Sequence, residues 1–158
     1  MNDKEDLQME KRYQVLRCGR LYDGITPEWK TGQSILIEDD HIAEIGNEVN
    51  IPEGARIIDL TDCQVTPGMI DAHMHMDFFD WHTVREEVYS QSEEAKTLAI
   101  ARCAKKALRR GFTTVRHVGG ITSNSYGVLD VKHAIEKGYF AGTWLPRCFS
   151  ALQEATGI

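Results

Sequence analysis

Pro67-Gly68-Met69-Ile70-Asp71-Ala72-His73-Met74-His75 is a short apolar run that ends in an acid and two histidines separated by one residue. In an extended strand successive side chains point to opposite faces, so His73 and His75 project the same way, about 6.6 Å apart along the strand. Neutral imidazole is the commonest metal ligand among side chains, and two of them supply half of a tetrahedral zinc shell. The alternative is a chance His-x-His in a chain with six histidines. The context of the motif favours a metal site.

The residues before this motif predict a small β-rich domain over 12–66, preceded by a charged, disordered tail over 1–11. Short runs of aliphatic and β-branched residues alternate there with Gly, Pro, Asn and Asp, which is typical of strands joined by turns. Strands are expected at 14–17, 34–38, 42–45 and 56–60. Asp39-Asp40 lies between two of these runs as a hairpin turn.

After the motif the hydrophobic period changes from strand to helix. Ser90-Gln91-Ser92-Glu93 is a capping-box signal, apolar residues follow at helical spacing, and Gly111 supplies the stop. A strand from Thr113 to Val118, a helix over 126–137 and a third strand over 147–152 come next. Alternating strands and helices indicate consecutive βα units of a parallel sheet. Residues 76–89 form an unusually long loop between the first strand and the first helix.

The Pro-Gly punctuation followed by Asp-Ala-His-x-His resembles the end of the first barrel strand in the amidohydrolase superfamily of metal-dependent hydrolases. Upstream, Leu21-Tyr22-Asp23-Gly24 and the run over 34–46 resemble the small β segment that precedes the barrel in that superfamily. Downstream, the run Gly111 to Gly120 is similar to the second barrel strand of the imidazolonepropionase-like branch, which includes Xaa-Pro dipeptidases. The resemblance covers roughly residues 13 to 147.

This resemblance implies an α/β fold: the N-terminal part of a (β/α)8 TIM-type barrel over 67–158, preceded by a small β-rich domain of the composite sandwich type. Eight βα units need about 250 residues, so 158 residues leave room for about three units. Members of the family complete the metal shell with a lysine from the fourth strand, histidines from the fifth and sixth, and an aspartate from the eighth. The chain is therefore expected to be an N-terminal fragment that is inactive alone.

The function implied by the resemblance is hydrolysis of C–N bonds by metal-activated water, in a peptide-like amide or a cyclic imide or amine. The expected cofactor is a divalent metal, zinc first, with one or two ions in the complete enzyme; two histidines also suit manganese, iron and cobalt. The alternative is a non-catalytic remnant, or a metal-binding or interaction module, that retains the motif. A reading frame continuing past Ile158 with the missing ligands would favour the enzyme.

Four further residues are site candidates, each with a structural alternative. Asp71 either orients an imidazole as a catalytic partner of the metal site or merely ends the strand. His117 stands where the resembling branch usually carries an acid; it contacts metal or substrate, or is a hydrogen-bonded structural histidine. His82 and Trp81 either line the substrate pocket or pack in an aromatic loop cluster.

The composition of the chain limits the classes of partner that it could bind. A formal net charge of −6 without a basic patch argues against nucleic acid, and no apolar run is long enough to span a membrane. The four cysteines form no C-x-x-C pair and no signal peptide precedes them, which favours a cytoplasmic protein with reduced thiols. The expected partner is a small-molecule amide or dipeptide-like substrate. The open edge of an incomplete barrel further predicts self-association into a homo-oligomer.

Overall fold

The computed structural model describes residues 11–77, 91–118 and 126–145. The chain divides into two compact units, Met1–Pro67 and Gly68–Ile158, and each is described by itself. No helix of the described part is long and apolar enough to cross a membrane. The three cysteines within it, Cys18, Cys63 and Cys103, are free.

The first unit is a five-stranded sheet with β1 at its centre. β1 pairs antiparallel with β2 and β3 and parallel with β5, and β3 pairs antiparallel with β4. The strands are β1 (Tyr13–Leu21), β2 (Lys30–Thr31), β3 (Ser34–Glu38), β4 (His41–Gly46) and β5 (Arg56–Val65). Cys18, Leu21 and Ile35 form its buried cluster.

The four predicted strands of this unit are confirmed, with β1 and β5 longer than the sequence indicated. The turn at Asp39-Asp40 is also confirmed, because these two residues alone separate β3 from β4. Asp39 has a φ of 55°, the left-handed conformation that two-residue hairpin turns require. β2 was not predicted; two exposed residues carry no hydrophobic period that could reveal a strand.

The second unit alternates strands and helices: β6 (Met69–Met74), α2 (Glu93–Arg109), β7 (Phe112–His117) and α3 (Gly127–Glu136). β6 and β7 are parallel, as the βα interpretation requires. An isolated parallel bridge joins Thr114 of β7 to Trp144, so the chain reaches the far edge of β7 directly after α3. The third strand predicted over 147–152 lies outside the described residues.

The start of α2 corrects one detail of the sequence prediction. Ser92, not Ser90, is the N-cap, and its hydroxyl oxygen accepts the amide N–H of Ala95 at 3.2 Å. Ser92 bonds the third helical amide because only the N-cap position presents a side-chain oxygen to that otherwise unpaired donor. The predicted end is confirmed: Gly111 follows the helix with a φ of 89°.

Gly68 explains why a Pro-Gly pair precedes β6. A Cβ built on Gly68 would lie 2.1 Å from the Thr113 Oγ1 atom, far inside van der Waals contact. The start of β6 can therefore approach β7 only because residue 68 has no side chain. The amide N–H of Met69 then donates to the carbonyl of Gly111 at 2.8 Å, which begins the parallel pairing.

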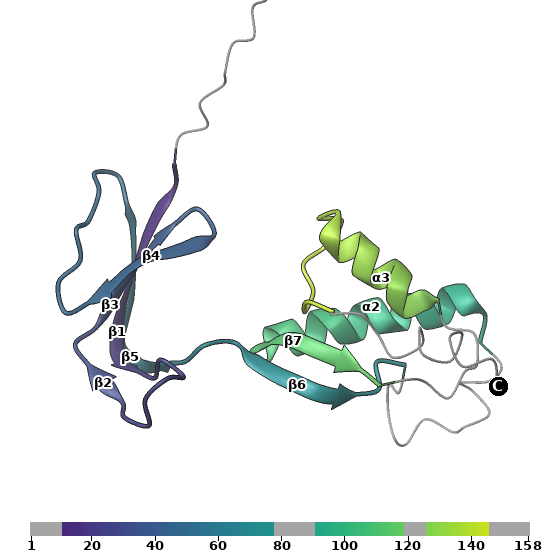
Figure 1. Cartoon of the computed structure of the whole chain (residues 1–158). Coiled ribbons are helices and arrows are strands. Elements are labelled where there is room, and N and C mark those ends of the chain that lie inside the picture. The colour runs from purple at the N-terminus through teal and green to yellow at the C-terminus, as the bar shows by residue number, and fades with distance from the viewer. Residues whose placement is uncertain (1–10, 78–90, 119–125, 146–158) are drawn as a thin grey trace, which may run out of the picture. The chain divides into compact units, whose positions relative to one another are not determined.

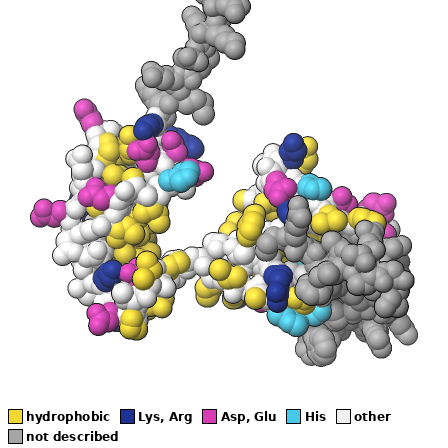
Figure 2. Space-filling model, in the orientation of Figure 1, with side chains coloured by type: hydrophobic (Ala, Val, Ile, Leu, Met, Phe, Trp, Pro, Cys, Tyr) yellow, Lys and Arg dark blue, Asp and Glu magenta, His cyan; other side chains and the backbone are white. Residues whose placement is uncertain are grey.

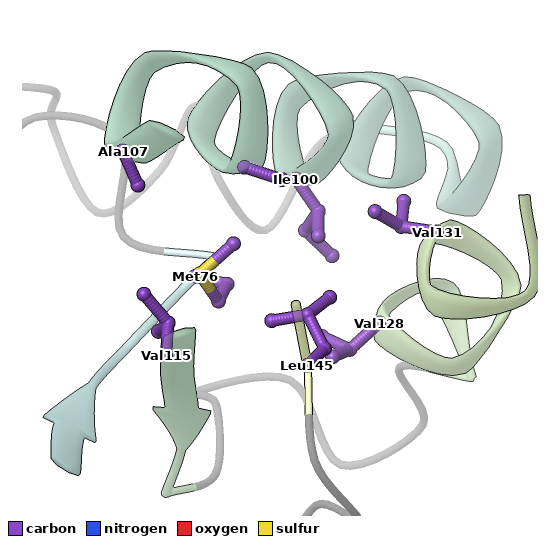
Figure 3. Close-up of a cluster of buried hydrophobic side chains, with 8 residues drawn as sticks. Met76, Ile100, Ala107, Val115, Val128, Val131 and Leu145 are labelled. Atoms are coloured by element: carbon purple, nitrogen blue, oxygen red, sulfur yellow. The ribbon is translucent and has the colours of Figure 1, made fainter. Parts of the chain in front are cut away.

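α2 packs on β7 of the β6–β7 pair, and α3 lies beside α2 (Figure 1). Side chains from all four elements meet in one apolar cluster, with Ile100 of α2, Val115 of β7 and Val128 of α3 directed toward one another (Figure 3). Met76, just after β6, fills the space between the strands and α2 and is fully buried.

The architecture is thus mixed α/β, with a sheet-rich N-terminal unit and parallel βα units after it. Two parallel strands and one bridge do not close a barrel within the described residues, so the TIM-type barrel stays a prediction.

Candidate metal centre

Three of the histidines singled out by the sequence lie together where β6 and β7 end. The ring centroids of His73 and His75 are 5.5 Å apart, and those of His75 and His117 are 6.5 Å apart. His73 and His75 are exposed, whereas His117 is buried. Figure 2 shows histidine side chains at the surface of this unit beside a basic side chain. The carboxyl ends of adjacent parallel strands always meet at one edge of a sheet, which is why these residues converge.

A bulge in β6 decides which face the two histidines occupy. Asp71 pairs with Val115 and Met74 pairs with His117, so Ala72 and His73 together stand opposite Arg116. Paired residues of neighbouring strands share a face, and Val115 and His117 are two positions apart. Asp71 and Met74 therefore share the helix-covered face although they are three positions apart. Alternation resumes after the bulge, so His73 and His75 lie on the opposite, exposed face.

The bulge leaves one peptide unit, between Ala72 and His73, without a register partner in β7. Both of its polar groups are bound by side chains instead. The Asp71 Oδ1 atom accepts the N–H of His73 at 3.0 Å, and the Arg116 Nε–H donates to the carbonyl of Ala72 at 2.7 Å. Asp71 thus binds the backbone of a candidate ligand. The sequence left open whether this acid orients an imidazole or ends a strand, and the observed contact is with the main chain.

The His73–His75 pair has the separation that one metal ion requires. Two imidazoles that bind one zinc ion at about 2.1 Å and at the tetrahedral angle have ring centroids roughly 5.4 Å apart. The observed separation is 5.5 Å with the ring planes at 70°. The predicted adjacency of the two rings is therefore confirmed, and their separation is the one that a shared ion needs. That these histidines bind metal remains a prediction.

His117 has a different environment. Its Nδ1 atom accepts the N–H of Met76 at 3.1 Å, so in the neutral ring the proton is on Nε2. Burial lowers the pKa of His117 and His75 lowers it further, while the Asp77 carboxylate and a hydrogen bond to the Met74 backbone oppose this shift. A centroid distance of 6.5 Å from His75 would require the two ligating nitrogens to lie almost opposite one another across a shared ion. The bond to the Met76 amide favours the structural alternative for His117; a contact with metal or substrate stays a prediction.

Asp77 was not singled out by the sequence. Its side chain is 4% exposed, and neither carboxylate oxygen has a hydrogen-bond partner among the described residues. Its charge also affects Cys103: burial raises the pKa of that thiol, Asp77 raises it further and Lys106 lowers it. Buried carboxylates are normally bonded or paired, so Asp77 is an exception among the described residues. The sequence signal that could have identified Asp77 as a site candidate is its position two residues after His75.

The remaining site candidates from the sequence lie in a segment that the structure does not describe. Trp81 and His82 lie outside the described residues. Within the part of the chain that the structure describes, no group of three or more His, Cys, Asp or Glu side chains is arranged to hold a metal. Arg116 was also missed, since an exposed arginine in a strand reads from the sequence as an ordinary surface residue.

The amidohydrolase family profile matches residues 64–156 of this chain. A dihydroorotase from Clostridium acetobutylicum is 29% identical over 102 residues, covering 64% of this chain and 20% of that protein. A D-hydantoinase from Geobacillus stearothermophilus is 40% identical over 67 residues, 42% of this chain and 13% of that protein. The chain thus spans about a fifth of the length of such curated relatives.

Solved structures give the same picture. A crystal structure of an amidohydrolase matches with a TM-score of 0.69 and 32% identity, over 84% of this chain and 30% of that chain. A Xaa-Pro dipeptidase with bound methionine in its active site matches with a TM-score of 0.72 and 26% identity, over 84% of this chain and 32% of that one. Both likenesses extend beyond the histidine motif to most of the chain.

Proposed function

Because this chain belongs to the amidohydrolase family, we propose that it forms the first part of the active site of a metal-dependent hydrolase of C–N bonds. The observation that carries the proposal is the pair of imidazoles at the end of β6, with centroids 5.5 Å apart. His73 and His75 would hold a divalent cation, zinc first, as half of its ligand shell. The remaining ligands are not among the described residues.

Each described residue has a separate task in this proposal. His73 and His75 bind through neutral ring nitrogens on the exposed face of β6. Asp71 fixes the backbone of His73, and His117 accepts the backbone N–H of Met76 and so holds Met76 in the core. A bound divalent cation supplies a water of lowered pKa and polarises the carbonyl to be attacked.

The proposed substrate is a small amide: a dipeptide-like or N-acyl amino acid, or a cyclic imide or amine. Similarity to a Xaa-Pro dipeptidase supports the first group, and similarity to a dihydroorotase and a D-hydantoinase supports the second. The proposal includes a cytoplasmic location, a β-rich domain over 12–66 and barrel units over 67–158.

Zinc binding by the purified chain tests the metal proposal. Competition with a chromophoric chelator should show binding that His73→Ala and His75→Ala each abolish. His41→Ala and His133→Ala are matched controls, because both histidines are exposed and lie outside the candidate centre. Equal zinc affinity in all five proteins, or no binding by the parent chain, would contradict the proposal.

Turnover tests the hydrolase proposal. With half of a metal shell, the 158-residue chain should hydrolyse Xaa-Pro dipeptides, N-acyl amino acids and cyclic imides no faster than zinc in buffer. The longest product of the reading frame containing this chain should hydrolyse one of these classes and lose the activity in His73→Ala. Zinc binding without turnover by that longer product would favour the non-catalytic alternative. Robust turnover by the short chain would show that a half-shell suffices or that a second copy completes it.

A further inference from the structure

We propose that Arg116 is a positioning residue: its side chain holds the β6 bulge in the form that turns His73 and His75 to one exposed face. The inference rests on the proposed metal role of these histidines, but the contact that carries it does not. The Arg116 Nε–H donates to the carbonyl of Ala72 at 2.7 Å, across from β7 to β6.

The bulge needs such a contact because it removes a peptide unit from the ladder. Ala72 and His73 have no register partners in β7, so the carbonyl of Ala72 and the N–H of His73 require other bonds. This segment is exposed, and water could satisfy both groups without fixing their direction. Arg116 on one side and Asp71 on the other bind them instead, at 2.7 and 3.0 Å, and thereby fix the orientation of the peptide plane.

The orientation of that plane determines where the imidazoles point. Without the bulge, strict alternation would place His73 on the face of Asp71 and Val115, which the helices cover. A shift of one residue in a strand moves every later side chain to the other face. Arg116 therefore acts on the metal pair through the backbone, without touching either ring.

The charge of Arg116 and its positioning contact predict opposite changes in zinc affinity when Arg116 is removed. A guanidinium near a cation site repels the ion, so deleting the charge should strengthen zinc binding if electrostatics were its main influence. Loss of a positioning contact should instead weaken zinc binding, roughly ten-fold by analogy with the partners of metal ligands. The sign of the change separates the two roles.

The test compares four variants of the purified chain. Arg116→Met removes both donor and charge, Arg116→Gln keeps a donor without charge, and Arg116→Lys keeps both with different reach. Arg102→Met is the control, because Arg102 is an exposed arginine on α2. Arg116→Met should weaken zinc binding about ten-fold. Arg116→Gln and Arg116→Lys should recover part of the loss, and Arg102→Met should match the parent.

Two metal-free readouts keep this inference separate from the proposed function. The ¹³C shift of the Ala72 carbonyl should change in Arg116→Met, and the NOE between the ring protons of His73 and His75 should be lost. Unchanged values of both, or zinc binding that is equal to or tighter than that of the parent, would overturn the inference. If the parent chain binds no zinc, the proposed function fails and the carbonyl shift and NOE still decide the role of Arg116. If Arg116→Met does not fold, as judged by amide exchange in α2, the Gln and Lys variants decide in the same way.

Discussion

Replacing His117 by leucine should destabilise the second unit, whereas asparagine at this position should be better tolerated. His117 is 3% exposed, and its Nδ1 atom is the acceptor for the N–H of Met76. Leucine has a similar shape to asparagine but no acceptor, so His117→Leu leaves a buried donor unpaired, at a cost of about 1–3 kcal/mol. The asparagine Oδ1 atom can replace Nδ1 and should recover roughly 1 kcal/mol of this loss.

Amide hydrogen exchange in α2 measures this difference for the second unit alone. All proteins should be compared at one concentration with a chelator present, because self-association and bound metal both shift apparent stability. Zinc affinity is then measured separately and should be unchanged in His117→Asn. Equal stability of the two variants would refute the proposed hydrogen-bond role. Loss of zinc binding in His117→Asn with normal α2 protection would show that His117 is a metal ligand.

The same residue predicts the direction of the pH dependence. Burial holds the pKa of His117 below its ordinary value of 6.5 in the folded chain. As pH falls through 6.5, the unfolded chain takes up this proton before the folded chain does. Stability should therefore decrease below pH 6.5, until the folded-state pKa is passed, and the decrease should be smaller in His117→Asn. A metal-free parent and variant with the same pH profile would contradict the burial argument.

The apolar cluster and the exposed strand give two more predictions. Ile100 is fully buried, so Ile100→Ala should lower the unfolding free energy of the second unit by about 2–5 kcal/mol. Leu98 on the same helix is 73% exposed, so Leu98→Ala should change this free energy by less than about 0.5 kcal/mol. Amide exchange checks both, and similar losses would mean that the cluster is not the core. Ile70 is 70% exposed on β6, and light scattering after size exclusion should show that the chain self-associates and that Ile70→Lys reduces this. A monomeric parent chain would show that the exposed part of β6 does not drive association.

The sequence alone determined most of the local structure. Alternating aliphatic runs fixed β3, β4 and β5, and the helical period ending at Gly111 fixed α2, because these signals depend on neighbours within a few residues. His-x-His in a strand required two neighbouring imidazoles for the same reason, and the rings are 5.5 Å apart. β2 and the true N-cap of α2 escaped prediction. Two residues carry no period, and the Ser-x-x-Glu pattern of a capping box begins at Ser90, whereas Ser92 is followed three residues later by Ala95.

Only the tertiary structure decided which face His73 and His75 occupy and which contacts hold their backbone there. The bulge depends on the register between β6 and β7, which are more than thirty residues apart in sequence, and no local pattern records it. For the same reason the bond from Arg116 to Ala72, and that from Met76 to His117, could not be read from the chain. Alternation predicts that the side chains of His73 and His75 point to the same face of the strand. Pairing with a distant strand determines which side of the sheet that is.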